Sequence, residues 1–325
     1  MGNDSEYYVQ GVCSGNRKML AKTITLIESS LPKHQELMTG VLDQLLPFTG
    51  NAIRLGISGV PGVGKSTFIE ALGMNLVERG HRIAILAVDP SSTHSGGSIM
   101  GDKTRMEKLS THPNAFIRPS PSGGTLGGVS RKTRESILVC EASGFDVIIV
   151  ETVGVGQSEV SVSSMVDFFL LLMLAGAGDD LQGIKRGILE LSDAIVINKA
   201  DGDNLNKALQ AKKIYADTMH LFSVDNTGWS PPVLTCSALH MTGIDDVWEM
   251  VLKHNKKLMD SGALEEKRKK QALEWMWVLL EEGLKDWFYQ LPEIKKLMPE
   301  ARWAVEKGTA TPAAAVKKLL NCLKN

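Results

Sequence analysis

Residues 59–66 read Gly-Val-Pro-Gly-Val-Gly-Lys-Ser, which matches the phosphate-loop pattern G-x-x-x-x-G-K-S at every fixed position. A strand-like run, residues 53–58, precedes this stretch, and an apolar segment, residues 67–77, follows it. A strand, a glycine-rich loop and a helix in this order distinguish a phosphate-binding loop from a chance glycine turn. The stretch therefore predicts that the chain binds a nucleoside triphosphate.

Each part of this loop has an expected role. The glycines let the backbone curl until several N–H groups point at one phosphate, and the dipole of the following helix adds positive potential. Lys65 is expected to reach the β- and γ-phosphates, and Ser66 is expected to hold Mg²⁺. The residues expected to contact the nucleotide here are Gly59, Val60, Pro61, Gly62, Val63, Gly64, Lys65, Ser66 and Thr67.

Length and composition limit the class of protein. The chain has 325 residues and a formal net charge of −1, enough for one large α/β domain with helical extensions. Near-neutrality gives no electrostatic reason to expect a nucleic acid or an anionic membrane as partner. The four cysteines are scattered without metal-ligand spacing, which favours a reducing compartment. No secretion signal, transit peptide or membrane span is visible, so we expect a soluble, cytoplasmic protein.

Strand-like and helix-like segments alternate after residue 52. Most of the strand-like segments are continuous apolar runs, which are typical of strands buried on both faces of a parallel sheet. The alternation predicts a doubly wound sheet with its ligand site at the carboxyl ends of the strands. The predicted strands are 53–58, 83–88, 115–118, 147–151, 168–174, 194–198 and 233–236, and the predicted helices are 67–79, 131–143, 183–192, 204–219 and 243–258.

Both ends of the chain are predicted to be helical. Residues 12–48 carry apolar residues at three-to-four spacing, interrupted at Pro32, which predicts an extension of about two helices. Residues 262–325 contain no strand-like run but hold four of the six tryptophans. These rings could pack within the chain or on a partner. We favour a homodimer arm, because the apolar area is large for a short appendage.

Residues 198–201 read Asn-Lys-Ala-Asp and follow a predicted strand directly. This is the N-K-x-D pattern by which GTPases recognise guanine. Guanine presents two donors, N1–H and N2–H, that one carboxylate accepts together, whereas adenine offers no such pair. The stem of Lys199 would cover the face of the base, and a backbone N–H after the last strand would meet guanine O6. The residues expected on this side are Asn198, Lys199, Asp201, Ser237, Ala238 and Leu239.

Acidic residues after two strands predict the magnesium side of the site. Glu151 ends one strand, where such an acid holds Mg²⁺ through water or orients the attacking water, and Gly154 would sense the γ-phosphate. Asp89 and Asp102 follow another strand. They are either acids on the Mg²⁺ side, as we favour, or turn-forming and helix-capping residues. The predicted Mg²⁺ ligands are therefore Ser66, Asp89, Asp102 and Glu151.

The catalytic set is predicted to be Lys65, Glu151, Asp89, Asp102 and Lys185. Lys185 lies in a charged, glycine-rich loop, residues 176–187, which is either an additional switch or a plain surface loop. Hydrolysis needs Mg²⁺, an in-line water and positive charge on the transferring phosphoryl group. No arginine finger is evident within the chain, so we expect a slow basal turnover that a partner or the dimer accelerates.

Several longer motifs together carry a specific resemblance. They are residues 88–92 (Val-Asp-Pro-Ser-Ser), 96–99 (Gly-Gly-Ser-Ile), 101–105 (Gly-Asp-Lys-Thr-Arg), 151–159 (Glu-Thr-Val-Gly-Val-Gly-Gln-Ser-Glu) and 177–185 (Ala-Gly-Asp-Asp-Leu-Gln-Gly-Ile-Lys). With them, the chain resembles the MeaB/ArgK family from about residue 20 to residue 260. These proteins are GTPase chaperones of methylmalonyl-CoA mutase and related adenosylcobalamin-dependent acyl-CoA mutases.

The resemblance implies a fold and an organisation. The fold would be a three-layer α/β P-loop NTPase, a SIMIBI-type G domain with a mostly parallel sheet, related to the signal-recognition and nickel-chaperone GTPases. It implies an N-terminal helical extension over residues 1–50, the GTPase domain over 51–260 and a C-terminal helical dimerisation arm over 261–325. The cofactors would be GTP or GDP and Mg²⁺.

The resemblance also implies a function. A family member binds the mutase and couples GTP hydrolysis to loading of adenosylcobalamin and to protection or reactivation of the enzyme. Asp89, Asp102 and Glu151 fall on the family's Mg²⁺ and switch positions, and Lys185 falls on its third switch, which transmits the nucleotide state to the mutase. No feature of the sequence identifies a corrin site.

Two other functions remain open. The first is a phosphotransferase, to which the family's older name, an arginine/lysine transport kinase, points. The N-K-A-D motif and the lack of a recognisable acceptor pocket count against it. The second is a metallochaperone GTPase, against which the missing Cys/His metal motifs count.

Overall fold

The computed structural model describes residues 2–88, 106–119, 126–152, 158–176, 186–219 and 228–322. The chain divides into two compact units, Met1–Glu266 and Lys267–Asn325. The first unit holds the sheet with the helices that cover it, and the second unit is helical.

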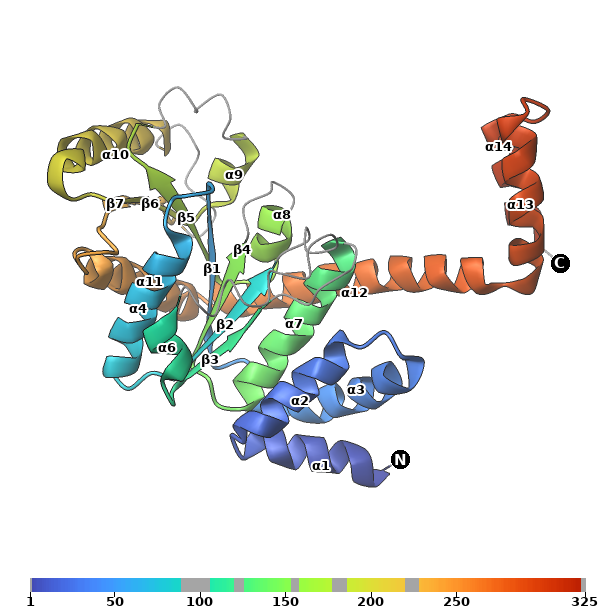
Figure 1. Cartoon of the computed structure of the whole chain (residues 1–325), viewed down its shortest axis with the longest axis horizontal. Coiled ribbons are helices and arrows are strands. Elements are labelled where there is room, and N and C mark those ends of the chain that lie inside the picture. Colours follow the sequence, from blue (N-terminus) through green and yellow to red (C-terminus); the bar gives the residue numbers. More distant parts are fainter. Residues whose placement is uncertain are drawn as a thin grey trace. The chain divides into compact units, whose positions relative to one another are not determined.

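The first unit is built on one seven-stranded sheet in the order β3-β2-β4-β1-β5-β6-β7, and every pairing is parallel (Figure 1). The central position of β1 brings the segment that follows it to the middle of the sheet. The doubly wound parallel sheet predicted from the sequence is therefore confirmed. The strands are β1 (Ile53–Gly59), β2 (Ile83–Val88), β3 (Ala115–Arg118), β4 (Val147–Thr152), β5 (Phe168–Leu174), β6 (Ala194–Asn198) and β7 (Val233–Thr235).

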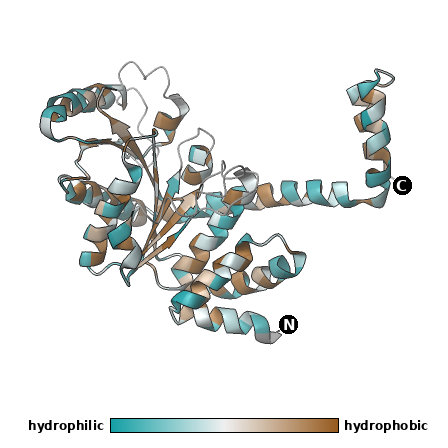
Figure 2. Cartoon of the chain, in the orientation of Figure 1, coloured by the Kyte–Doolittle hydropathy of each residue, from teal (hydrophilic) through white to brown (hydrophobic). Residues whose placement is uncertain are grey.

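Helices cover both faces of the sheet and give three layers (Figures 1 and 2). Successive strand residues point to opposite faces, so Ile148 and Ile149 of β4 belong to different hydrophobic cores. This explains why the strands read as unbroken apolar runs. One layer contains α4 (Lys65–Glu78), α6 (Glu107–Thr111) and α11 (Ile244–Asp260), and the other contains α7 (Leu126–Ala142), α8 (Ser158–Ser163), α9 (Arg186–Leu191) and α10 (Leu205–Met219).

Three helices precede the sheet: α1 (Gly2–Cys13), α2 (Arg17–Glu28) and α3 (Pro32–Leu45), followed by the short 3₁₀ turn Leu46–Phe48. Pro32 begins α3, as its fixed φ favours. The two helices predicted over residues 12–48 correspond to α2 and α3, whereas α1, which precedes them, was not predicted. α1 is mostly polar, with few buried residues such as Tyr8 and Val12, and it is held by packing on α2 and α3. A short segment with few apolar residues and weak periodicity is difficult to predict as a helix from sequence alone.

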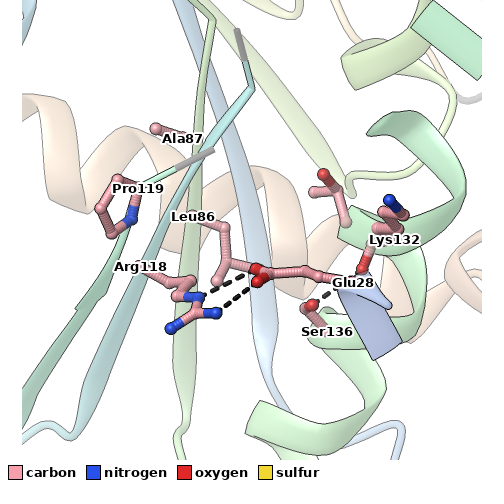
Figure 3. Close-up of a pocket in the computed structure, with 8 residues that line it drawn as sticks. Glu28, Leu86, Ala87, Arg118, Pro119, Lys132 and Ser136 are labelled. Carbon is pink, nitrogen blue, oxygen red and sulfur yellow. Dashed lines mark hydrogen bonds and ion pairs between the residues drawn. The ribbon is translucent and has the colours of Figure 1, made fainter. Parts of the chain in front are cut away.

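An ion pair joins this extension to the sheet. Arg118, the last residue of β3, donates to both carboxylate oxygens of Glu28 at the end of α2 (Figure 3). It also donates to the Thr25 hydroxyl. The pair lines a small cavity, and none of the residues that line this cavity belongs to the phosphate loop. The cavity is lined by Glu28, Leu86, Ala87, Arg118, Pro119, Lys132, Thr133 and Ser136.

The second unit contains most of α12 (Ala263–Gln290), together with α13 (Pro292–Glu306) and α14 (Pro312–Asn321). Ile294 and Ala301 of α13 pack against Ala315 and Leu319 of α14. Over the residues described between 262 and 322 no strand occurs, as predicted. No helix within the described ranges combines the length and the apolar character needed to cross a membrane.

Candidate nucleotide-binding site

The predicted phosphate loop lies between the end of β1 and the first residue of α4. Gly64 immediately precedes the helix with φ 92°, a left-handed conformation that favours glycine. A Cβ at this position would lie 3.0 Å from Nδ2 of Asn198. Lys65 turns back over the loop, and its Nζ donates to the carbonyl oxygens of Gly59 at 2.7 Å and Val60 at 3.4 Å. The loop's own backbone therefore orients the ammonium group.

Glu151 lies close to this lysine at the carboxyl end of β4. Its Cα pairs with Ile57 of β1 on one side and with Ala87 of β2 on the other. The Glu151 side chain is buried, with 7% of the residue exposed. Burial lowers the pKa of Lys65, and the carboxylates of Glu151 and Glu159 act against this effect. The site thus places acidic groups around one partly buried ammonium.

Asn198 connects the phosphate loop to the loop after β7. Its Nδ2 donates to the Val63 carbonyl oxygen at 2.9 Å. Its Oδ1 accepts from the Ala238 backbone N–H at 3.2 Å and from the Cys236 thiol at 3.4 Å. One buried amide therefore fixes two loops that are far apart in the sequence. Val63 is fully buried and belongs to the hydrophobic core, so its side chain does not face a ligand.

Lys199 and Asp201 complete the guanine motif. Lys199 has a positive φ of 59°, and its Nζ donates to the Gly62 carbonyl oxygen at 2.9 Å, so its stem runs from β6 toward the phosphate loop. Asp201 accepts a hydrogen bond at Oδ2 from the Ser237 hydroxyl. The backbone N–H of Ala200 donates to the Cys236 carbonyl oxygen at 2.9 Å. These bonds hold the two guanine-side loops next to each other.

The remaining predicted residues differ in exposure. Ser66 and Thr67 occupy the first turn of α4, where Ser66 is half-buried and Thr67 is exposed. Pro61 is exposed at the loop tip. Leu239 is 74% exposed, so its side chain packs against little of the protein, and the backbone of its loop is the part that could contact a base.

Ser66 and Glu151 provide a hydroxyl and a carboxylate, both hard oxygen donors of the kind that Mg²⁺ prefers. Mg²⁺ usually takes one or two protein ligands and completes its shell with waters and phosphate oxygens. The chemistry of these two described residues therefore fits Mg²⁺ bound together with a nucleotide. Within the described ranges, no group of three or more His, Cys, Asp and Glu side chains could hold a metal ion alone.

Four predicted site residues lie outside the described residues: Asp89, Asp102, Gly154 and Lys185. β2 ends at Val88, whose Cα pairs with Thr152. Asp89 is the next residue along the chain.

Two residues of the site were not predicted as functional. Cys236 bonds to Asn198, and burial raises the pKa of its thiol to about 12, so it acts as a neutral donor. In the sequence, only its position directly before Ser237 suggests that it lies near the nucleotide site. Glu159 is the last residue of the motif that begins at Glu151, and the sequence pattern gives it no role.

Comparison with known proteins agrees with this geometry. A family model described as methylmalonyl Co-A mutase-associated GTPase MeaB matches residues 20–293. A protein of Caulobacter vibrioides named putative GTPase is 52% identical over 307 residues, which is 94% of each chain. The Mus musculus protein named methylmalonic aciduria type A homolog, mitochondrial, is 43% identical over 97% of this chain and 78% of its own.

A solved structure supports the fold over the full length. It is titled crystal structure of LAO/AO transport system kinase, and it is 38% identical with a TM-score of 0.78. The match covers 100% of this chain and 99% of that chain.

Proposed function

Because the chain belongs to the family of methylmalonyl-CoA mutase-associated GTPases, MeaB, we propose that it is a GTP-hydrolysing chaperone of methylmalonyl-CoA mutase or a related adenosylcobalamin-dependent acyl-CoA mutase. It couples hydrolysis to cofactor loading and to protection or reactivation of the mutase. The observation that carries the nucleotide part is the set of bonds at Asn198, which joins the phosphate loop to the loop after β7. The family description carries the mutase part.

Binding follows from the described side chains. The carboxylate of Asp201, oriented by Ser237, accepts from N1–H and N2–H of guanine, and the stem of Lys199 covers the base. The backbone of residues 59–64 surrounds the phosphates, and Lys65 exchanges its carbonyl partners for phosphate oxygens. The base and the phosphates are thus bound by two loops that Asn198 holds together.

Hydrolysis requires charge compensation at the phosphoryl group. Ser66, Glu151, Asp89 and Asp102 would hold Mg²⁺, which would neutralise charge on the phosphates when it is bound. Lys65 supplies a further positive charge to the transferring group, and Glu151 lies where an acid can orient water. Since no arginine finger is evident in the sequence, basal turnover is slow and is raised by a partner or by dimerisation. Lys185 reports the nucleotide state to the mutase.

Dimerisation and location complete the proposal. Residues 1–50 form a helical extension, residues 51–260 the GTPase domain, and residues 261–325 an arm that pairs with a second copy. The client is the mutase, and neither a nucleic acid nor a membrane is a partner. The protein works in the cytoplasm, and its four free cysteines are compatible with a reducing compartment.

The nucleotide part is tested by calorimetry with GTP, GDP and ATP in the presence of Mg²⁺. We expect GTP and GDP to bind and ATP to bind at least about a hundredfold more weakly, since adenine leaves the Asp201 carboxylate unpaired. Equal binding of ATP and GTP would refute guanine recognition.

The chaperone part is tested by pull-down of purified methylmalonyl-CoA mutase with GTP, with GDP and without nucleotide. Nucleotide-dependent capture supports the proposal, and lack of capture in all three conditions contradicts it.

The name of the matched structure, LAO/AO transport system kinase, favours a second candidate, a phosphotransferase. Incubation with γ-labelled GTP and basic amino acids or a transport protein separates the two functions. Label released as inorganic phosphate supports hydrolysis, and label on an acceptor supports the kinase. A third candidate, a metallochaperone, would require equilibrium binding of a transition metal more tightly than Mg²⁺.

A further inference from the structure

A pair of buried hydroxyl groups joins β1 to β4 beside the phosphate loop, and the proposed function gives this pair no role. Thr152 Oγ1, in the last residue of β4, donates to Ser58 Oγ, in β1, at 2.8 Å. Neither residue is exposed to solvent. A buried hydroxyl is costly unless it is hydrogen-bonded, and two apolar side chains would fill the same space without this cost. The value of the pair therefore lies in the two strands that it connects.

The hydrogen bond lies where the backbone pairing of β1 with β4 ends. The last paired residues of these two strands are Ile57 and Glu151. One step farther along, Ser58 still pairs with β5 on its other side, and Thr152 still pairs with β2. The bond between the two side chains thus extends the connection of β1 and β4 by one residue beyond the backbone pairing.

Both residues adjoin groups of the nucleotide site. Ser58 precedes Gly59, whose carbonyl oxygen accepts from Lys65 Nζ at 2.7 Å. Thr152 follows Glu151, the acid that we propose to hold Mg²⁺ or to orient the attacking water. The hydrogen bond therefore connects the start of the phosphate loop to the strand end that carries this acid, with one peptide unit at each side.

The pair does not itself face the nucleotide. Successive strand residues point to opposite faces of the sheet. Glu151 shares its face with Ile149, in the core to which α4 contributes, whereas Thr152 shares the opposite face with Val150. Ser58 and Thr152 can therefore act on the reaction only through the position of Glu151 and of the phosphate loop.

We propose that Ser58 and Thr152 are positioning residues whose hydrogen bond fixes Glu151 relative to the phosphate loop. Without this bond, the ends of β1 and β4 are free to separate where their backbone pairing stops, and Glu151 loses its alignment with Lys65. Hydrolysis and the effect of Mg²⁺ then weaken, while the loops that bind guanine and the phosphates keep their own hydrogen bonds. The inference rests on the proposed binding and hydrolysis of GTP at this site.

The test compares Thr152→Val with wild type, because valine keeps the shape of threonine and removes the donor. Calorimetry in EDTA should give GDP affinities that agree within about twofold. The tightening of GDP binding by Mg²⁺ and the kcat of GTP hydrolysis should each fall about tenfold, as is typical when a group that orients a metal ligand is removed. Thr152→Ser keeps the donor and should retain both values.

Ser58→Ala and the double variant Ser58→Ala/Thr152→Val test whether the bond itself carries the effect. Each single variant leaves one hydroxyl without its partner, and the double variant removes both. If the pair acts as a unit, the double variant should lose about tenfold in kcat, as each single variant does. A loss of about a hundredfold would mean that the two residues act independently and would contradict the proposal.

Thr23→Val is the matched control for a loss of stability alone. Thr23 is 0% exposed, and its Oγ1 donates to the Met19 carbonyl oxygen at 2.8 Å within α2. This variant also removes one buried hydrogen bond, so it should lower the midpoint of thermal unfolding but leave kcat and the effect of Mg²⁺ unchanged. If it lowers kcat as much as Thr152→Val does, the proposal is overturned.

The outcomes separate this inference from the proposed function. If wild type hydrolyses GTP but Thr152→Val keeps the wild-type kcat, or loses GDP affinity in EDTA as strongly as it loses kcat, the inference is overturned and the proposed function stands. If wild type neither binds nor hydrolyses GTP, both proposals fail. Should Thr152→Val not fold, Ser58→Ala takes its place with the same expected values.

Discussion

At the scale of single residues, the nucleotide site depends on side chains whose hydrogen bonds bridge distant segments. Asn198 bonds to Val63 and to Ala238, which belong to loops after β1 and after β7. Its amide is suited to this task because it has both donors and an acceptor. Asp201, three residues later, is the residue that we propose to recognise the base, and the Ser237 hydroxyl, which donates to its carboxylate, orients it.

Asp201→Asn should reverse the choice of base. The amide presents a donor where guanine also presents one, so GTP binding should weaken by about 2–3 kcal/mol. Xanthosine triphosphate carries a carbonyl oxygen at that position and should bind the variant more tightly than the wild type does. Competition calorimetry with the two nucleotides measures this. Unchanged preference for guanine would mean that another residue recognises the base.

Lys65→Ala should act through the phosphates and not through the base. Its effect on affinity should grow from GMP to GDP to GTP, because the ammonium is expected at the β- and γ-phosphates. GTP hydrolysis should fall by at least about a hundredfold. Asp201→Asn is the matched comparison, since its loss should be similar for all three nucleotides. Normal turnover in Lys65→Ala would remove this lysine from the mechanism.

Sequence patterns predicted roles for residues whose chemistry is fixed by local spacing, such as Lys65 in the phosphate loop and Asp201 in N-K-A-D. They did not identify Cys236 as a donor to Asn198 or the effect of Glu159 on the pKa of Lys65. Both of these depend on how segments distant in sequence meet at the carboxyl edge of the sheet. Such contacts are set by strand order, which no local pattern contains.

At the scale of elements, a buried ion pair links the end of α7 to the start of β1. Glu141 accepts from Arg54 Nε at 2.7 Å and Nη2 at 3.0 Å, and from the Gly50 N–H at 2.8 Å. Its side chain is 1% exposed. The pair joins a helix of the outer layer to the segment that enters the central strand.

Glu141→Ala should destabilise the first unit by about 3–5 kcal/mol, because it leaves the Arg54 guanidinium and the Gly50 N–H without their acceptor. Urea unfolding followed by circular dichroism measures the loss. Asp260→Ala is the control, since its pair with Lys256 is exposed and should contribute less than about 0.5 kcal/mol. Equal effects of the two substitutions would contradict a structural role for the buried pair.

The strands were predicted to within about a residue at their ends because a buried parallel strand is apolar throughout. Helix boundaries were less accurate. α7 begins at Leu126 and not at residue 131, since Leu126–Ser130 includes two glycines that suggested a loop. α1 was missed because its helix depends on tertiary packing and not on its own periodicity.

At the scale of the whole molecule, the second unit exposes apolar side chains along α12. Within residues 267–290 of α12, apolar side chains recur at spacings of three, four and seven, which places them on one face. Several are about half exposed, including Leu273, Trp277, Leu280, Leu284 and Trp287. An exposed apolar stripe of this length marks an interaction surface. A second copy of the same helix supplies a matching stripe, which is why we propose a homodimer.

Replacement of Trp277 and Trp287 by Glu should therefore convert a dimer into a monomer. Each ring is more than half exposed, at 58% and 53%, so neither substitution should disturb the fold of one chain. Two charges on a buried dimer interface would each lose solvation, and dissociation should rise by at least about a hundredfold. Light scattering after gel filtration measures the mass, and circular dichroism verifies the helices.

The control is Trp303→Glu, on α13, which should remain dimeric if the stripe on α12 forms the interface. A wild-type chain that is monomeric at micromolar concentration would leave the stripe to a different partner, and the pull-down with the mutase would then be repeated with the double variant.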